Sequence, residues 1–286
     1  MPMINEVVFL KLGGSLITDK DAAYTPRLDT LKNLALEIKT VLDSAPALSL
    51  ILGHGSGSFG HVAAKKYGTR EGTPLRLPPN SPNLGGVSQN GDWEYWQGFA
   101  EVRYQAAELN RFVVQALLEA GIPALPFPPS ASMISDNRKV IHHNVETIRR
   151  ALSAGLLPVV QGDVAFDESL GGTILSTEDV FAFLAEQFPV SRILLAGIEA
   201  GVWEDFPARN RLLKEIQLSR YDEALKGGIK GSVSADVTGG MKAKVEEMFA
   251  LIQKNAGLTA QIFSAEEPGA LARALRGENV GTLLTP

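Results

Sequence analysis

Hydrophobic positions along the chain follow two alternating patterns. Short continuous apolar runs are typical of strands buried on both faces, and longer segments with leucine and isoleucine at helical spacing are typical of amphipathic helices. The expected strands are residues 7–12, 48–52, 157–163, 191–197 and 260–265. The expected helices are residues 27–42, 96–121, 145–155 and 241–257, and a short helix after the last strand. This alternation predicts an α/β fold, with a mostly parallel sheet covered by helices on both faces.

One segment breaks the alternation. Residues 68–92 are rich in glycine, proline and asparagine and have no hydrophobic periodicity. Such a segment inside a compact domain predicts a long loop. The whole chain of 286 residues is long enough to bury a sizeable core, as one large domain or two lobes.

Composition and charge narrow the class of protein. The net charge of −5 argues against a general binder of nucleic acid or of membrane surfaces. The chain has no cysteine, which excludes disulfides, thiolate catalysis and cysteine-based zinc sites. We find no signal peptide and no apolar run near the ~20 residues of a membrane span, so we expect a cytoplasmic protein.

Two glycine-rich turns follow the first two expected strands. They read KLGGS at residues 11–15 and GHGSGSFGH at residues 53–61. Glycine lets backbone N–H groups converge on an anion, and the start of the following helix adds the positive end of its dipole. Ligands of α/β sheets bind beyond the carboxyl ends of strands. The two turns therefore predict a site for two anionic groups that face each other.

Known phosphate-binding motifs do not account for these turns. The sequence lacks the P-loop pattern, the landmarks of protein kinases and the glycine spacing of a dinucleotide-binding fingerprint. Phosphoryl chemistry would need other groups to neutralise the transferred phosphate. The obvious suppliers are Lys11, Lys20, Lys242 and Lys244, which lie beside glycine turns.

Five motifs in order resemble a known family. KLGGSLITDK, GHGSGSFGH, VVQGDV, STEDV and DVTGGMKAK extend over nearly the whole chain. Together they resemble the amino acid kinase superfamily, and most closely its isopentenyl phosphate kinase branch. The resemblance implies a three-layer α/β/α sandwich with a mostly parallel central sheet. It also implies a single domain over 1–286, with an acceptor-binding lobe (about 1–165) and a nucleotide-binding lobe (about 166–286).

The resemblance implies a role for each matched residue. The expected catalytic residues are Lys11, Lys20, His61, Asp163 and Lys244, with Asp163 as the carboxylate that orients the lysines. The expected contacts of the acceptor phosphate are Gly55, His61 and Gly162. The expected nucleotide contacts are Lys11, Gly13, Gly14, Ser15, Ser56, Gly57, Asp179, Gly240 and Lys244.

The family also implies cofactors and partners. ATP would be the phosphoryl donor, and Mg²⁺ would be held mainly by the nucleotide phosphates rather than by protein side chains. The substrate would be a small phosphorylated acceptor, and the assembly a homodimer. Residues 198–202 depart from the family, because Ile198 and Ala200 replace two aspartates. Nucleoside contacts there are not predicted.

Several of these residues also have a purely structural interpretation. Lys242 is expected on a solvated helix face, paired with Glu246 or Glu247. The STED segment is typical of a helix start, with Ser176 or Thr177 as cap, and Glu178 is assigned to that start alone. His142 and His143 are expected to be structural, since neighbours on a strand point to opposite faces. Trp93, Trp96 and Phe99 are expected in the core, although the family's prenyl pocket lies along this helix.

Four classes of function remain to be compared. The first is transfer of the γ-phosphoryl group of ATP to isopentenyl phosphate. The second is a kinase of the same superfamily with another acceptor, such as fosfomycin, a carboxylate or a nucleoside monophosphate. The third is a serine hydrolase that uses Ser56 or Ser58 with His61, although the glycine–serine spacing does not fit a nucleophile elbow. The fourth is a regulatory binding domain, which would not need Lys20, Asp163 and Lys244 together.

Overall fold

The computed structural model describes residues 6–73, 90–221 and 240–286. Its first half contains β1 (Val7–Leu12), α1 (Gly14–Ile17), α2 (Leu28–Ser44), β2 (Ser49–His54), α3 (Gly57–Tyr67), α4 (Asn90–Glu119), β3 (Ala124–Pro126), η1 (Pro129–Ala131), β4 (Met133–Asp136), β5 (Lys139–His143) and α5 (Glu146–Ser153). Its second half contains β6 (Leu157–Gln161), β7 (Asp163–Asp167), β8 (Gly171–Leu175), α6 (Thr177–Ala185), β9 (Val190–Gly197), β10 (Val202–Trp203), β11 (Leu212–Leu213), β12 (Glu215–Gln217), η2 (Leu218–Arg220), α8 (Met241–Lys254), β13 (Thr259–Ser264), α9 (Ala270–Leu275) and β14 (Thr282–Thr285).

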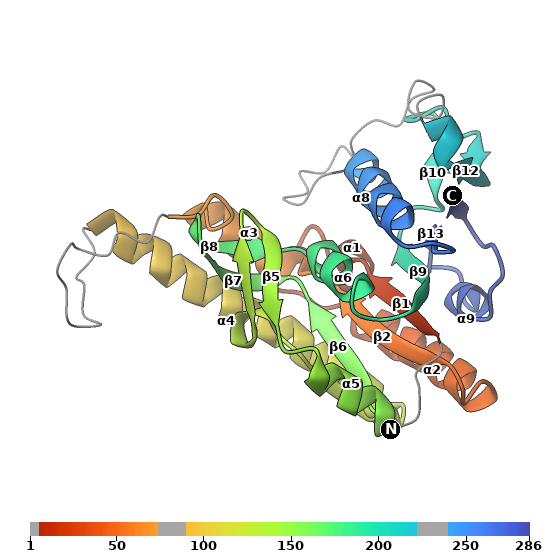
Figure 1. Cartoon of the computed structure of the whole chain (residues 1–286), viewed down its shortest axis with the longest axis horizontal. Helices are drawn as coiled ribbons and strands as arrows, with labels where there is room; N and C mark the ends of the chain where they lie inside the picture. The colour runs from red at the N-terminus through yellow and green to blue at the C-terminus, as the bar shows by residue number, and fades with distance from the viewer. Residues whose placement is uncertain (1–5, 74–89, 222–239) are drawn as a thin grey trace.

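An eight-stranded sheet forms the centre of the molecule, in the order β12-β14-β13-β9-β1-β2-β6-β3 (Figure 1). The strands from β13 to β3 pair in parallel, and β14 runs antiparallel to β13 at the other side. The mostly parallel sheet of the sequence analysis is therefore confirmed. β14 was not predicted, because its four residues follow a short helix without a long apolar run.

Each face of the sheet carries its own layer of helices. In β1, Val7 and Phe9 pack with apolar residues of α6 and α8, whereas Val8 and Leu10 pack with α2, α4 and α9 on the opposite face. All four side chains are fully buried, which explains why β1 is apolar at every position rather than at alternate ones. The structure is thus the expected three-layer α/β/α sandwich.

A second, four-stranded sheet has the order β5-β4-β7-β8 and lies at one end of the elongated molecule. It was not predicted, because the sequence interpretation treated residues 157–163 as one strand. The chain instead ends β6 at Gln161 and begins β7 at Asp163, so only Gly162 separates the two sheets. The predicted lobe boundary near residue 165 falls inside β7, whose pairing with β8 is continuous across it. The division into two lobes stays a prediction.

The expected loop over residues 68–92 is wrong at its C-terminal end. Residues 90–92 already belong to α4, which begins six residues before the expected helix 96–121. Residues 74–89 of that expectation lie outside the described part of the chain. Residues 68–73 are anchored to the small sheet, since Thr73 N donates to the Leu170 carbonyl at 2.8 Å.

Candidate active site

Two glycine turns meet at the carboxyl ends of the central strands. β1 and β2 are neighbours in register, with Leu12 opposite His54, and each leads directly into its turn. A Cβ atom on Gly14 would lie 2.5 Å from the backbone nitrogen of Gly57 and 2.6 Å from its Cα. The two turns therefore touch backbone to backbone, and only glycine permits this approach.

Some backbone amides of the two turns are hydrogen-bonded and others are not. Gly13 N donates to the Ala196 carbonyl at 2.7 Å, and Gly55 N donates to the Leu12 carbonyl at 2.9 Å. Within the described residues, the amides of Gly14, Ser15, Ser56 and Gly57 donate no hydrogen bond. Amides at the starts of α1 and α3 that lack partners are suited to bind anionic oxygens.

Lys11 is the second-last residue of β1, opposite Gly53 of β2. Its ammonium group donates to Glu178 Oε1 in a buried ion pair, and Glu178 is only 4% exposed. Burial alone would raise the pKa of Glu178, but the charges of Lys11 and Lys244 and the hydrogen bond from Lys11 hold that pKa below its ordinary value. Lys11, Lys244 and Glu178 thus form one electrostatic group.

Glu178 lies in the first turn of α6, as expected, but it also pairs with Lys11, so the helix start is not its only role. Asp163, which was expected to orient the lysines, instead accepts from Ser130 Oγ at 2.6 Å and lies 3.5 Å from Arg103 Nε. The reason is its place at the start of β7, which packs against η1 and α4 rather than against α8. Burial raises the pKa of Asp163 to about 6, although Ser130 and Arg103 oppose the shift.

Asp179 caps α6, as the helix-start interpretation allowed. Its amide donates to Ser176 Oγ at 3.0 Å, and its carboxylate accepts from Ser176 N at 2.7 Å, which makes a capping box. Burial raises the pKa of Asp179. Glu247 of α8 faces the same region and was missed, because it resembles any helix-surface acid. Burial raises its pKa to about 7, and the charges of Glu178 and Asp179 add to the shift.

The two lysines of α8 have different surroundings. Lys242 is 53% exposed along its side chain and lies 3.7 Å from Glu246 Oε1, as predicted for a solvated face. Lys244 is half-buried, its amide donates to the carbonyl of Gly240, and its charge acts on Glu178. Only Lys244 therefore belongs to the electrostatic group around Lys11.

The acceptor-side residues lie along β2, α3 and the end of β6. Gly55 follows β2, and the half-buried His61 lies on α3. Gly162 N donates to the His54 carbonyl at 3.3 Å, which places Gly162 beside the end of β2. Lys20 is exposed, in the segment that follows α1.

His54 is built into the core of the site rather than exposed to it. Its Nε2 lies 2.9 Å from Asn110 Nδ2 and its Nδ1 lies 3.1 Å from the Gly55 carbonyl. A neutral ring that donates from Nδ1 and accepts at Nε2 satisfies both contacts. Burial, helped by the charge of Lys11, lowers the pKa of His54 to about 4, so the ring is neutral near pH 7.

The remaining sequence interpretations have clear outcomes. His143 is buried and His142 is exposed, and no group of three or more His, Asp or Glu side chains in the described residues could hold a metal ion. Phe99 is buried and Trp96 packs beside it, but Trp93 is 64% exposed, so the core assignment of Trp93 is wrong. Trp93 lies on the first turn of α4, ahead of the contact with the small sheet.

The segment that departs from the family contacts neighbouring residues rather than the lysines. Ile198 packs against the α2–α4 face of the core. Glu199, between the two replaced positions, accepts from Trp203 Nε1 at 3.2 Å and from Arg209 Nη2 at 2.6 Å. These contacts hold the turn before β10.

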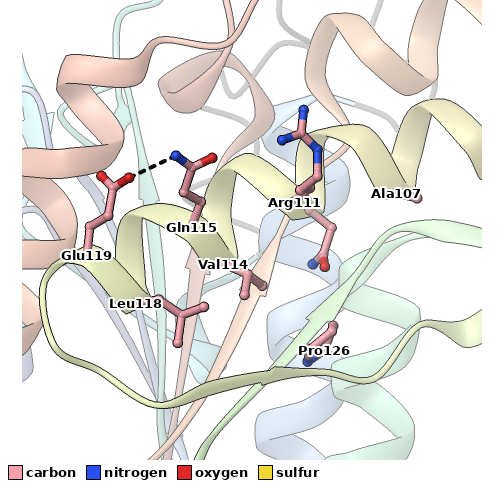
Figure 2. A pocket seen from close by; sticks show the side chains of 8 residues that line it. Ala107, Arg111, Val114, Gln115, Leu118, Glu119 and Pro126 are labelled. Atoms are coloured by element: carbon pink, nitrogen blue, oxygen red, sulfur yellow. Dashed lines mark hydrogen bonds between the residues drawn. The ribbon is translucent and has the colours of Figure 1, made fainter.

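A separate pocket lies between α4 and the end of β3 (Figure 2). It is lined by Ala107, Asn110, Arg111, Val114, Gln115, Leu118, Glu119 and Pro126. Gln115 donates to Glu119 across its rim at 2.8 Å. None of the predicted site residues lines this pocket, so it is distinct from the junction of the two turns.

In the described residues, no helix is both long and apolar enough to cross a bilayer.

The hydroxyl of Ser58 is buried and has no hydrogen-bond partner in the described structure. No base therefore activates Ser58, which argues against this residue as the nucleophile of a serine hydrolase.

Comparisons with known proteins agree with this geometry. The model of the amino acid kinase family matches residues 6–264. Isopentenyl phosphate kinase of Methanocaldococcus jannaschii is 31% identical over 96% of this chain and 97% of its own. The enzyme of that name from Methanothermobacter thermautotrophicus is 34% identical over 98% and 99%. A solved isopentenyl phosphate kinase superposes with a TM-score of 0.78 at 30% identity, covering 98% of this chain and all of that one. The chain belongs to the amino acid kinase family and, within it, to the isopentenyl phosphate kinases.

Proposed function

We propose that this protein transfers the γ-phosphoryl group of ATP to isopentenyl phosphate, giving isopentenyl diphosphate and ADP. The observation that carries the proposal is the backbone contact between the Gly14 and Gly57 turns, beside the buried Lys11. Two anion-binding turns held this close suit a reaction that joins two phosphate groups. The near full-length similarity to isopentenyl phosphate kinases supports the choice of acceptor.

The donor phosphates would lie on the β1 side of the junction and extend toward α8. Lys11, Gly13, Gly14 and Ser15 would contact them from β1 and α1. Ser56 and Gly57 would lie between donor and acceptor. Gly240 and Lys244 would contact the nucleotide at the start of α8, and Asp179 would do so at the start of α6. Glu178 would orient Lys11 from below.

The acceptor phosphate would be held by Gly55, His61 and Gly162. Its oxygen is already an anionic nucleophile, so no general base and no covalent enzyme intermediate are needed. One P–O bond forms between this oxygen and the γ-phosphorus, while the bond to the β-phosphate oxygen breaks. Lys20 would neutralise the phosphoryl group in transit, and the site acts through alignment and charge.

Magnesium would accompany the nucleotide rather than occupy a protein cage. The described residues present amides and lysines around the junction and no cluster of carboxylates for a metal ion. This donor set fits phosphate oxygens, and Mg²⁺ bound to them would neutralise part of their charge. We also propose that the protein acts in the cytoplasm as a homodimer, in isoprenoid biosynthesis.

Other acceptors are less well supported. Glutamate 5-kinase of Hydrogenovibrio crunogenus is 32% identical over only 49% of this chain, whereas the isopentenyl phosphate kinases match nearly all of it. A carboxylate acceptor also gives no role to an imidazole at position 61. A coupled assay of ADP release with isopentenyl, dimethylallyl and geranyl phosphate, fosfomycin and glutamate tests the choice. We expect turnover with the prenyl phosphates and Mg²⁺.

His61→Ala is expected to lower kcat/KM for isopentenyl phosphate roughly ten- to a hundredfold, because a hydrogen bond to a charged group is worth ~1.5–3 kcal/mol. The KM for ATP should stay nearly unchanged. His61→Gln keeps a neutral donor and should retain more activity than alanine. Steady-state kinetics with each substrate varied in turn provide the measurement.

The matched control for this prediction is His54→Asn. His54 is in the same glycine-rich segment but is buried against Asn110, so its replacement should lower stability more than acceptor affinity. If His61→Ala raises the KM for ATP and leaves the KM for isopentenyl phosphate unchanged, the two turns have been assigned to donor and acceptor the wrong way round.

A further inference from the structure

Thr18 connects the two glycine turns through a single hydroxyl group. The residue directly follows α1 and is 1% exposed. Its Oγ1 donates to the Gly14 carbonyl at 2.8 Å and accepts from the Ser58 amide at 3.0 Å. The hydroxyl thus donates a hydrogen bond to the first turn and accepts one from the second. Ser56, the N-cap residue of α3, makes no side-chain cap, so Thr18 caps this helix from another part of the chain.

Packing around Thr18 leaves little room for adjustment. A Cβ on Gly57 would lie 2.2 Å from Thr18 Oγ1 and 2.7 Å from its methyl carbon. Gly57 also has φ +50°, in the left-handed region that favours glycine. The second turn therefore rests directly on the threonine side chain, and the position of that side chain fixes the spacing between the turns.

Thr18 is also the base of the segment that carries Lys20. It forms a bridge with Pro26, and Asp19 N donates to the Thr25 carbonyl at 2.9 Å. At the far end of the segment, Tyr24 packs edge-on against Phe59 of α3, with ring centroids 5.9 Å apart. The segment from Thr18 to Pro26 is therefore attached to α3 at both its base and its tip.

We propose that Thr18 is a positioning residue for phosphoryl transfer. Its hydroxyl sets the distance between the turn for the donor phosphates and the turn for the acceptor phosphate, and it anchors the segment of Lys20. This proposal rests on the proposed function. Because the reacting atoms must approach to roughly 3–3.5 Å, a small increase in spacing slows transfer even when each phosphate still binds its own turn.

The test compares Thr18→Val, which keeps the shape and loses the hydroxyl, with Thr18→Ser, which keeps the hydroxyl. We expect Thr18→Val to lower kcat about ten- to a hundredfold, with the KM of each substrate within about threefold of the parent. Thr18→Ser should stay within about threefold in kcat. If Thr18→Val does not fold, Thr18→Ala replaces it, because alanine also lacks the hydroxyl and is smaller. The same loss of kcat is expected for Thr18→Ala.

The control is Thr40→Val. Thr40 donates to the Leu36 carbonyl four residues earlier at 2.8 Å, just as Thr18 donates to Gly14, but it lies exposed on α2. The Thr40→Val variant should have the same kcat as the parent protein. Equal kcat in the valine, alanine and parent proteins, or equal losses in the serine and valine variants, would overturn the proposal.

The hydrogen-exchange rate of the Ser58 amide tests the role of Thr18 independently of the proposed function. Exchange should be faster in Thr18→Val than in the parent and nearly unchanged in Thr18→Ser, whether or not the assay finds an acceptor. Unchanged exchange in the valine variant would contradict the proposed link between the turns. Absence of turnover in the parent protein, by contrast, would contradict only the proposed function and its consequence for kcat.

Discussion

Lys244→Ala and Lys20→Ala should each lower kcat by about 10²–10³-fold, with smaller changes in KM. The reason is that both charges act most strongly while the phosphoryl group lies between two oxygens, and losing such a contact typically costs about 3–4 kcal/mol. The half-buried Lys244 acts on the buried Glu178 at the centre of the site. Steady-state kinetics with saturating ATP and isopentenyl phosphate provide the measurement.

Lys242→Ala is the matched control on the same helix. Its ammonium group lies 3.7 Å from Glu246 in an exposed pair, which contributes little to stability. Activity within about twofold of the parent is expected, since exposed pairs of this kind are worth about 0–1 kcal/mol. An inactive Lys242→Ala beside a normal Lys244→Ala would show that the site uses the other face of α8.

Glu178→Gln should lower the free energy of unfolding by about 3–5 kcal/mol, because it leaves the ammonium group of Lys11 buried without a counter-charge. The pair joins residues 167 positions apart, from β1 and α6. Urea unfolding at pH 7 measures the loss. Glu246→Gln, which breaks only the exposed pair with Lys242, should cost under about 1 kcal/mol.

A double-mutant cycle tests whether the cost of Glu178→Gln comes from the pair itself. Lys11→Met/Glu178→Gln removes both charges, so it should cost clearly less than the sum of its single variants. Additive single costs would mean that Glu178 stabilises α6 in some other way and does not hold Lys11. Catalytic activity should fall in every variant of the cycle, since Lys11 is proposed to contact the donor phosphates.

The parts of the structure that depend on local patterns could be predicted. The run Val7–Leu10 of β1 is apolar because both faces of the strand are buried. The turns after β1 and β2 are rich in glycine because no other residue allows the Gly14–Gly57 contact. The small sheet could not be predicted in the same way. Its strands have four or five residues, and outward-facing side chains such as Ile134 and Phe166 are 41% and 50% exposed. Short apolar stretches of this kind give no clear period.

Roles that depend on long-range contacts also could not be predicted from the sequence. An acid in the first turn of a helix satisfies the dipole, so nothing local distinguishes Glu178 from an ordinary N-terminal acid. Its partner Lys11 is identified only once α6 packs on β1. For Asp163 the family motif implies contact with the lysines. The break between β6 and β7 instead places its carboxylate beside Ser130 and Arg103. Thr18 has a local signal, its place before Lys20, but its bond to Ser58 depends on tertiary packing.

The most direct test of the central claim is to identify the product by ³¹P NMR after incubation with ATP, Mg²⁺ and isopentenyl phosphate. The phosphomonoester signal should be replaced by the two coupled signals of a diphosphate, in step with ADP formation, and Lys244→Ala should slow this conversion. No diphosphate from isopentenyl, dimethylallyl or geranyl phosphate, together with turnover of fosfomycin under the same conditions, would contradict the assignment.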